Sequence, residues 1–341
     1  MRIGMLVSGG DCPGLNAAIR GAVLRGGDVH GHEYIGYLGG WQGVIDNQHI
    51  PLNRLTVRGL SPQGGTILGT SRVSPLTDGY GVEALKEHMR ENQIDAFMTI
   101  GGNGTQTVAH ILAEAGIPVV GLPKTIDNDL EGSDYSFGFD TAVSIATESI
   151  DRLRTTGESH RRCMVLEVMG REAGWIALNA GMAGGAQVIL LSEFSESIEQ
   201  IAAWVTHVKD RGRTALVVVA EGFKLDGMGE EITRDGLDGF GRPRLGGIAE
   251  VLAPMIEDHT GIESRATVLG HIQRGGVPTA FDRVLATRAG ITGADAINDG
   301  NFGTMVASRG DKLTLIPLKD VAGKTKQVSR ERYDEMRELF G

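Results

Sequence analysis

The most constraining feature of this sequence is an alternation between short apolar runs and longer amphipathic stretches. The first run, residues 2–9 (RIGMLVSG), precedes an amphipathic stretch from Leu15 to Arg25. Continuous apolar runs separated by helices are typical of parallel strands that are covered on both faces. The pattern therefore predicts an α/β fold of doubly wound, mainly parallel sheets. The other expected strands are 95–102, 118–123, 163–170, 187–193 and 215–222, and the other expected helices are 105–115, 144–157, 197–210 and one beginning at Trp175.

Chain length indicates more than one hydrophobic core. With 341 residues, the sequence is long for a single core, so two domains are expected. The polar, glycine-rich stretch 223–244 has no periodicity and predicts a loop or insertion, whereas the tail 329–341 predicts a short surface helix. No apolar run approaches the ~18 residues that a membrane-spanning helix needs, so no membrane association is expected.

Charge and cysteine content narrow the class of partner. The formal net charge is −10, which argues against nucleic acid as the main partner while leaving room for a locally basic anion site. Cys12 and Cys163 give neither a disulfide framework nor a CxxC metal pattern, so a reducing cytoplasm is expected. The 51 glycines, about twice the usual ~7%, occur mostly in pairs at the ends of apolar runs.

Two of these glycine clusters predict phosphate contacts. Residues 8–16 (SGGDCPGLN) and 100–107 (IGGNGTQT) each join an expected strand to an expected helix. A helix N-terminus offers free backbone N–H groups and a positive dipole end to an anion. A tight turn or a simple helix cap explains either motif equally well when it is taken alone. Neither is a Walker A loop or a GxGxxG fingerprint, and this disfavours a nicotinamide dehydrogenase.

A third cluster, residues 122–130 (LPKTIDNDL), carries acidic side chains. Asp127 and Asp129 lie two residues apart, just after a lysine and a threonine. One carboxylate can accept a proton from an attacking hydroxyl group while the other holds a hydrated Mg²⁺ ion. Asx turns would explain the same residues without any ligand. Three such clusters at strand ends favour a phosphate site.

The second half of the chain supplies basic residues near apolar strands. Arginine binds phosphate through a bidentate fork, so a cluster of arginines on an acidic protein indicates a local anion site. The candidates there are Arg162, Arg171, Glu221, Arg265, His271 and Arg274.

Together these motifs resemble the phosphofructokinase family. GGDCPG, GGTILGTSR (64–72), GGNGT, PKTIDND, MGREAGW and LGHIQRGG follow one another in the family's order, and the resemblance runs from residue 1 to about residue 320. It implies a 6-phosphofructokinase that moves a phosphoryl group from ATP to the 1-hydroxyl of fructose 6-phosphate, as a homotetramer with Mg²⁺. It also implies an active site between two domains. These would be 1–138 plus about 273–305 for the donor, and 139–272 plus about 306–341 for fructose 6-phosphate.

The resemblance assigns roles to individual residues. Asp127 resembles the general base, while Thr125, Arg72 and Arg171 resemble groups that contact the transferred phosphoryl. Asp129 and, more weakly, Asn103 resemble the residues that organise Mg²⁺. The donor-binding positions are matched by Gly10, Ser71, Arg72, Gly102, Asn103, Gly104, Thr105 and Lys124. The sugar-phosphate positions are matched by Thr125, Asp127, Arg162, Met169, Gly170, Arg171, Glu221, Arg265, His271 and Arg274, with Arg162 and Arg265 reaching in from a neighbouring subunit.

Two departures from the common bacterial pattern leave the phosphoryl donor open. Asn103 replaces an aspartate that faces magnesium, and Lys124 replaces a glycine. Lysine there is typical of pyrophosphate-dependent members and of one ATP-dependent branch. Pyrophosphate enzymes usually also carry aspartate where this chain has Gly104, so ATP is favoured.

The sugar substrate and the regulation of the chain also remain open. A related kinase for sedoheptulose 7-phosphate would have nearly the same pocket, and Asn103 also fits a catalytically weak regulatory paralogue. Allosteric control is a further expectation. Its effector site would be lined by basic residues and by Gln187, which stands where an acidic residue is common. The basic residues are Arg54, Arg154, Arg211 and Arg213.

Overall fold

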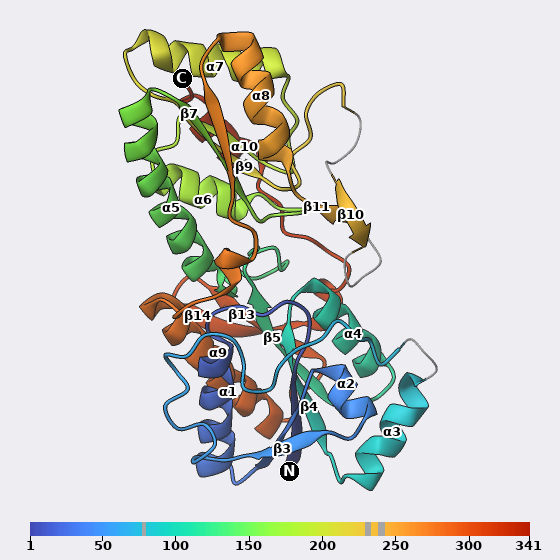
Figure 1. Cartoon of the computed structure of the whole chain (residues 1–341). Coiled ribbons are helices and arrows are strands. Elements are labelled where there is room, and N and C mark those ends of the chain that lie inside the picture. Colours follow the sequence, from blue (N-terminus) through green and yellow to red (C-terminus); the bar gives the residue numbers. More distant parts are fainter. Residues whose placement is uncertain (77–79, 229–232, 238–242) are drawn as a thin grey trace. The chain divides into compact units, whose positions relative to one another are not determined.

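The computed structural model describes residues 1–76, 80–228, 233–237 and 243–341 (Figure 1). The chain divides into two compact units. The first unit comprises Met1–Thr141 and Arg274–Lys326, and the second comprises Ala142–Gln273 and Gln327–Gly341. The first unit thus extends to Lys326, whereas the resemblance implied a boundary near residue 305. The reason is strand pairing, because β13 (Thr304–Arg309) pairs with β5 (Val119–Thr125) of the first unit and β14 (Lys312–Pro317) pairs with β13.

The first unit is built on one eight-stranded sheet. Its order is β14-β13-β5-β4-β1-β2-β3, with β6 beside β5. Only β2/β3 and β13/β14 pair antiparallel. The chain leaves β1 toward β2 on one side and returns to β4 on the other, so the carboxyl ends of β1 and β4 form a topological switch point, where ligands bind in such sheets. The remaining bounds are β1 Arg2–Val7, β2 Glu33–Tyr37, β3 His49–Leu52, β4 Ala96–Gly101 and β6 Phe137–Gly138.

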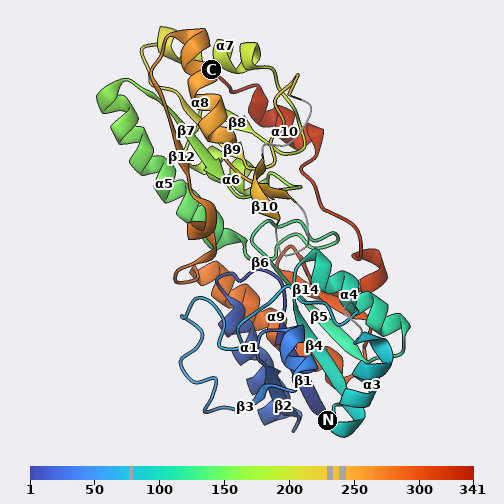
Figure 2. The same cartoon turned by 45° about the vertical axis from the view of Figure 1, so that its right-hand side comes forward.

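Helices cover both faces of this sheet. On one face α1 (Leu15–Val23) and α9 (Ala280–Asn298) lie side by side, as Figures 1 and 2 both show. Glycine permits this close approach, because a Cβ on Gly290 would lie 2.2 Å from the carbonyl oxygen of Ala18. The opposite face is covered by α3 and α4, whose Leu85 and Leu112 share a buried cluster with strand residues. The other bounds are a π-helical turn Leu24–Val29, α2 Trp41–Ile45, α3 Gly81–Glu91, α4 Asn103–Glu114 and a 3₁₀ turn Leu318–Asp320.

The second unit contains a four-stranded parallel sheet of order β12-β7-β9-β8. Residues of α7 and α8 pack with Val165 and Val217 in one buried cluster. Its strands are β7 Cys163–Val168, β8 Val188–Leu190, β9 Leu216–Ala220 and β12 Ser264–Val268, and its helices are α5 Phe139–His160 (which begins in the first unit), α6 Trp175–Ala183, α7 Ile198–Asp210, α8 Ile248–Thr260 and α10 Arg330–Arg337. A 3₁₀ turn, Gly270–Arg274, follows β12.

The expected strands and helices are all present, with shifted ends in several cases. Helix α5 is longer than expected, because Phe139 and Ala142 continue its buried face toward the N-terminus. The stretch expected to be an aperiodic loop contains a short antiparallel pair, β10 (Thr233–Leu237) with β11 (Pro243–Leu245). Parts of that stretch, 229–232 and 238–242, lie outside the described residues. Among the described helices, none has both the length and the hydropathy to cross a bilayer.

Candidate active site

The loop after β1 and the segment 64–72 lie against each other in the first unit. The backbone N–H of Gly9 donates to the carbonyl oxygen of Ser71 at 2.9 Å. The buried Asn16 holds the start of the segment, since its Nδ2 donates to the carbonyls of Gln63 and Gly64, both at 3.2 Å. Two motifs about fifty residues apart are thereby joined, and Ser71, followed by the exposed Arg72, is placed beside Gly9.

The side chain of Lys124 holds the same loop through hydrogen bonds to its backbone. Its side chain is 3% exposed, and Nζ donates to the carbonyl oxygens of Ser8, at 3.1 Å, and Gly10. Burial is the main cause that lowers the pKa of Lys124 to about 8. Thr105 also donates to the carbonyl of Ser8, at 3.3 Å. The observed bonds of Lys124 are therefore to the loop that presents Gly10, and its contact with a donor stays a prediction.

Asn103 and Asp129 meet at the ends of β4 and β5. The amide Nδ2 of Asn103 donates to Oδ2 of Asp129 at 2.8 Å. Gly102 precedes this asparagine as the N-cap of α4, and the exposed Gly104 follows it in the first turn. Within the described part of the chain, Oδ1 of Asn103 is buried and accepts no hydrogen bond. The pair presents oxygen atoms at the N-terminus of a helix, where negative charge is stabilised.

The acidic loop that carries Asp127 is held by side chains around it. Thr125 Oγ1 accepts a hydrogen bond from the backbone N–H of Asp127 at 3.1 Å. Asn128 has a left-handed φ of 52°, and its Oδ1 accepts from the N–H of Ser136 at 3.0 Å. These bonds turn the backbone sharply between the two aspartates, so the loop geometry is fixed locally.

Lys326 is a positioning residue that the sequence analysis did not single out. Its backbone N–H donates to the carbonyl of Asp129 at 2.8 Å, and Nζ donates to the carbonyls of Ser133, at 2.7 Å, and Asp134, at 3.0 Å. Mainly through burial, the pKa of Lys326 falls to about 8. Nearly two hundred residues separate it from the loop, and no local motif marks it.

Arg274 belongs to the first unit, although the sequence analysis grouped it with the basic residues of the second half. Its Nη1 donates to the carbonyl oxygen of Asp11 at 3.2 Å. A Cβ on Gly10 would lie 2.6 Å from the same nitrogen, so glycine is needed for this approach. The guanidinium group thus lies at the loop expected to contact the donor phosphates.

In the second unit, candidate residues follow the carboxyl ends of β7, β9 and β12. Met169 and Gly170 follow β7, and the N–H of Glu221, just after β9, donates to the carbonyl of Val168 at 2.9 Å. Gly170 has a φ of +137°, and a Cβ there would lie 2.7 Å from the carbonyl of Ala173. A Cβ on Gly222 would lie 2.1 Å from the carbonyl oxygen of Arg171, so the backbone of Arg171 packs directly on the turn that carries Glu221. The exposed His271 lies in the 3₁₀ turn after β12.

Arg162 and Arg265 lie at the other end of that sheet. Arg162 immediately precedes β7, and Arg265 is in register with Met164. Six residues separate Met164 from Gly170, which is about 20 Å in an extended strand. Both arginines pair with Glu263, Arg162 Nε at 2.7 Å from Oε2, and above all the bond from Arg162 lowers the pKa of that carboxyl. One copy of the second unit therefore does not bring these two arginines to Gly170 and Glu221.

The expected effector-site residues lie in both units. Arg54, in the first unit, pairs with Asp28. In the second unit, Arg154 donates to the carbonyl of Gly185 at 2.8 Å, and Gln187 Nε2 donates to the same carbonyl at 3.0 Å. Arg211 and Arg213 follow α7, and Arg211 donates to the carbonyl of Gly341 at 3.0 Å. Nothing in these contacts tests the binding of an effector, which stays a prediction.

Glycine-rich turns and an acidic loop at the carboxyl ends of parallel strands define an α/β enzyme suited to phosphoryl-group chemistry. The sequence model of the family described as Phosphofructokinase matches residues 2–297. The chain therefore belongs to the phosphofructokinase family, and it is a phosphotransferase enzyme.

Relatives of both donor types are similar to this chain. A pyrophosphate–fructose 6-phosphate 1-phosphotransferase from Amycolatopsis methanolica is 52% identical over 342 residues, covering all of both chains. ATP-dependent 6-phosphofructokinase 3 from Streptomyces coelicolor is 47% identical over 98% of both chains. A crystal structure of Pichia pastoris phosphofructokinase in the T-state matches 94% of this chain with a TM-score of 0.82 and 30% identity. This chain spans 35% of that longer one.

Proposed function

We propose that this enzyme transfers the γ-phosphoryl group of ATP to the 1-hydroxyl group of fructose 6-phosphate, giving fructose 1,6-bisphosphate. Membership of the phosphofructokinase family supports the reaction type. The observation that carries the choice of donor is Gly104, exposed in the first turn of α4 next to Asn103. An aspartate there, as is usual in pyrophosphate-dependent members, would place a carboxylate against the α-phosphate of a nucleotide. Glycine leaves that space open.

The position of Lys124 removes an objection to ATP. Lysine at this place is typical of pyrophosphate enzymes, where a cation could compensate a highly charged donor. Here the ammonium group is buried and bonded to the Ser8 and Gly10 carbonyls. Its role is accounted for by loop geometry, so its presence does not require pyrophosphate.

The residues of the first unit fit a Mg²⁺ ion. Mg²⁺ prefers oxygen ligands, keeps several waters, and is usually held by one or two carboxylates together with substrate phosphates. Asp129 supplies a carboxylate and Asn103 a buried amide oxygen. Among the described residues there is no group of three His, Cys, Asp or Glu side chains that could hold a metal alone, which fits an ion held jointly with the donor. Such an ion would neutralise charge on the phosphates.

In the proposed reaction, Asp127 accepts the proton of the 1-hydroxyl group as that oxygen attacks the phosphoryl group. Its carboxylate is held close to the end of β5 by the bond from its backbone N–H to Thr125. Arg72 and Arg171 would neutralise charge on the transferred group, and Gly10 would offer its backbone N–H to the donor. Met169, Gly170, Glu221, His271 and Arg274 would bind the sugar phosphate.

Pyrophosphate is the second candidate donor, because relatives of 52%, 49% and 50% identity carry pyrophosphate-dependent names. The deciding experiment measures fructose 1,6-bisphosphate formation from fructose 6-phosphate with ATP and, separately, with pyrophosphate, at the same Mg²⁺ concentration. We expect a kcat/KM for ATP at least about tenfold above that for pyrophosphate, a difference of about 1.4 kcal/mol. A protein that works only with pyrophosphate would overturn the proposal.

A homotetramer is proposed as the working form. The supporting observation is the place of Arg162 and Arg265, about one strand length from Gly170 and Glu221. If both arginines bind the sugar phosphate, as the resemblance implies, they do so in the site of a neighbouring subunit. Sedimentation at working concentration tests the assembly itself.

A further inference from the structure

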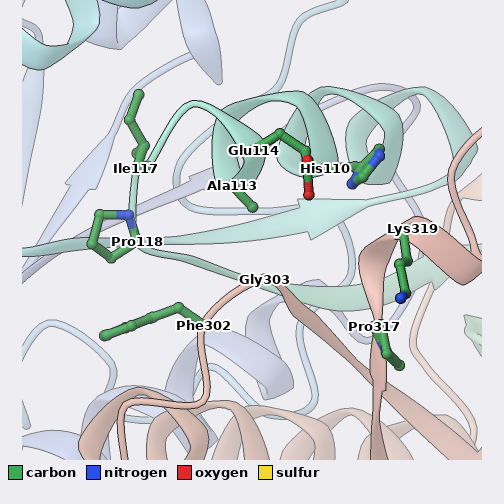
Figure 3. A pocket seen from close by; sticks show the side chains of 10 residues that line it. His110, Ala113, Glu114, Ile117, Pro118, Phe302, Gly303, Pro317 and Lys319 are labelled. Atoms are coloured by element: carbon green, nitrogen blue, oxygen red, sulfur yellow. The ribbon is translucent and has the colours of Figure 1, made fainter.

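The first unit has a pocket of about 420 Å³ at the end of its sheet opposite to the candidate active site (Figure 3). Pro118, which lines it, immediately precedes β5, whereas Thr125 and the acidic loop follow the other end of that strand. Glu114 lines it from the last turn of α4, whose first turn carries Asn103. This volume is within the usual range for small-molecule sites, and none of its lining residues has a role in the proposed reaction.

The lining divides into an apolar side and a polar side. Figure 3 shows Ile117, Pro118 and Phe302 on one side, and His110, Glu114 and Lys319 on the other. His110 and Glu114 are four residues apart on α4, so they share one helix face. Lys319 comes from the 3₁₀ turn after β14. A ligand that fits must therefore have an apolar body and a polar head.

The polar side carries two opposite charges that are not paired with each other. Within the described part of the chain, neither Glu114 nor Lys319 forms an ion pair or a side-chain hydrogen bond. Glu114 is also placed unfavourably for a carboxylate, because the C-terminal end of a helix is negative and the last turn of α4 has no basic residue. Both side chains are exposed, so water solvates them when no ligand is bound. A cationic group of a ligand would replace water at Glu114 and at the negative end of the helix, while Lys319 offers a partner for an anionic group.

We propose that this pocket binds an α-amino acid with an apolar or aromatic side chain. The ammonium group would contact Glu114 and the C-terminal end of α4, and the carboxylate would contact Lys319. The side chain would pack on Phe302, Ile117 and Pro118. A ligand with only one of the two charges would interact with only one of these side chains, so a zwitterionic head fits the pocket best.

The test is a calorimetric titration of the 341-residue chain with L-phenylalanine and with L-leucine, at concentrations up to about 10 mM. N-acetylphenylalanine lacks the ammonium charge, and phenylalaninamide lacks the carboxylate. We expect saturable binding of the free amino acids with a Kd below about 1 mM, and binding at least about tenfold weaker for both derivatives. Absence of saturable binding by either amino acid overturns the proposal.

Variants locate the site by removing, one at a time, the pocket charge proposed to contact the ammonium group or the carboxylate of the ligand. Glu114→Gln should weaken binding of the free amino acid about tenfold. In this variant the free amino acid and its N-acetyl derivative should bind with equal affinity. Lys319→Met should likewise weaken binding of the free amino acid about tenfold, and phenylalanine and phenylalaninamide should then bind this variant with equal affinity. Glu199→Gln and Lys209→Met, both exposed on α7, are the matched controls and should change nothing. Equal binding by the wild type, Glu114→Gln and Lys319→Met would place the amino acid elsewhere and refute the assignment.

Discussion

The side-chain amide of Asn103 donates a hydrogen bond of 2.8 Å to the carboxylate of Asp129. This contact joins the first turn of α4 to the acidic loop after β5, and so fixes where the Asp129 carboxylate lies. The neutral amide stabilises that carboxylate, whereas an aspartate, the common residue of the family at this place, would repel it. Because Asn103 stands in place of that aspartate, this chain has one negative charge fewer beside the proposed metal.

We therefore expect Asn103→Asp to lower the Mg²⁺ concentration that gives half the maximal rate. A second carboxylate is a stronger ligand than an amide oxygen. Without Mg²⁺, loss of the hydrogen bond and the new repulsion should lower Tm by a few degrees, corresponding to about 1 kcal/mol. Rates across a Mg²⁺ titration, and thermal unfolding with and without Mg²⁺, measure both effects.

The control for that variant is Asn301→Asp, which adds the same charge at an exposed position before β13. It should leave both the Mg²⁺ dependence and Tm unchanged. If Asn103→Asp also leaves them unchanged, Asn103 has no part in metal binding and its proposed role is wrong.

Gly104→Asp should shift the donor preference away from ATP. The new carboxylate would meet the nucleotide α-phosphate both sterically and electrostatically, so we expect the ATP KM to rise by about tenfold or more. Gly104→Ala is the matched control, since it adds a Cβ without charge and separates the two effects. Initial rates over ATP concentration, with pyrophosphate in parallel, provide the measurement. An unaltered ATP KM in Gly104→Asp would show that this side chain does not face the nucleotide.

Asp127→Ser should lower kcat by roughly 10²–10⁴ and leave the fructose 6-phosphate KM nearly unchanged, as loss of a general base predicts. The backbone bond from residue 127 to Thr125 survives the substitution, so the loop should keep its shape. Asp311→Ser, an exposed change in the turn between β13 and β14, serves as the control. Steady-state kinetics suffice, and a kcat like that of the wild type would remove Asp127 from its proposed role.

Lys124 should make stability depend on pH in the alkaline range. Its folded-state pKa of about 8 lies below the ordinary value of 10.5, so between these values the unfolded chain binds more protons. The destabilisation from burying the charge is thus fully present below pH 8 and is relieved as pH rises toward 10.5. For Lys124→Met we expect a smaller rise of unfolding free energy over this range, by up to about 1.4 kcal/mol per pH unit.

Urea unfolding at several pH values from 8 to 10 measures that slope. Lys326→Met is the matched comparison, because Lys326 has a pKa that burial likewise lowers to about 8. Each variant should show a smaller increase of unfolding free energy with pH than the wild type. In the double variant the two reductions should add. If Lys124→Met follows the wild type at every pH, Lys124 does not titrate in this range.

Much of this molecule could be predicted from its residues because the signals are local. Apolar runs mark β1, β4, β5, β7, β8 and β9, and the glycine and acidic clusters follow the ends of these strands. Parallel pairing then brings such ends to one edge of a sheet, so Gly10, Asn103 and Asp129 could be grouped without knowing the strand order.

What the sequence analysis missed depends on long-range pairing. Strands β13 and β14 extend the first sheet after more than a hundred residues that belong to the second unit. The first unit therefore ends later in the sequence than the expected boundary near residue 305. Lys326 holds the carbonyl of Asp129 through its backbone, an interaction that any residue type except proline can make. The buried contact of Lys124 with two carbonyls likewise follows from the neighbouring loop rather than from its own motif.

The last prediction concerns Arg162 and Arg265. Both pair with Glu263 at the amino ends of β7 and β12, away from Gly170 and Glu221 in the same chain. If they complete the site of a neighbouring subunit, a chain with Arg162→Ala and Arg265→Ala should be nearly inactive alone. It should regain activity when it is mixed with an Asp127→Ser chain. Each hybrid interface then holds one complete site, so random mixing should restore up to about a quarter of wild-type activity.

The matched control mixes Asp127→Ser chains with Asp129→Ser chains. Both changes lie in the same loop of the first unit, so a hybrid of these two chains contains no complete site and should stay inactive. Subunit exchange is verified by native mass spectrometry of chains with different tags, because recovery is meaningful only where hybrids form. Activity restored in the arginine mixture alone places Arg162 and Arg265 across an interface. Verified hybrids without recovery would mean that each chain uses its own arginines or none, and the shared site would have to be abandoned.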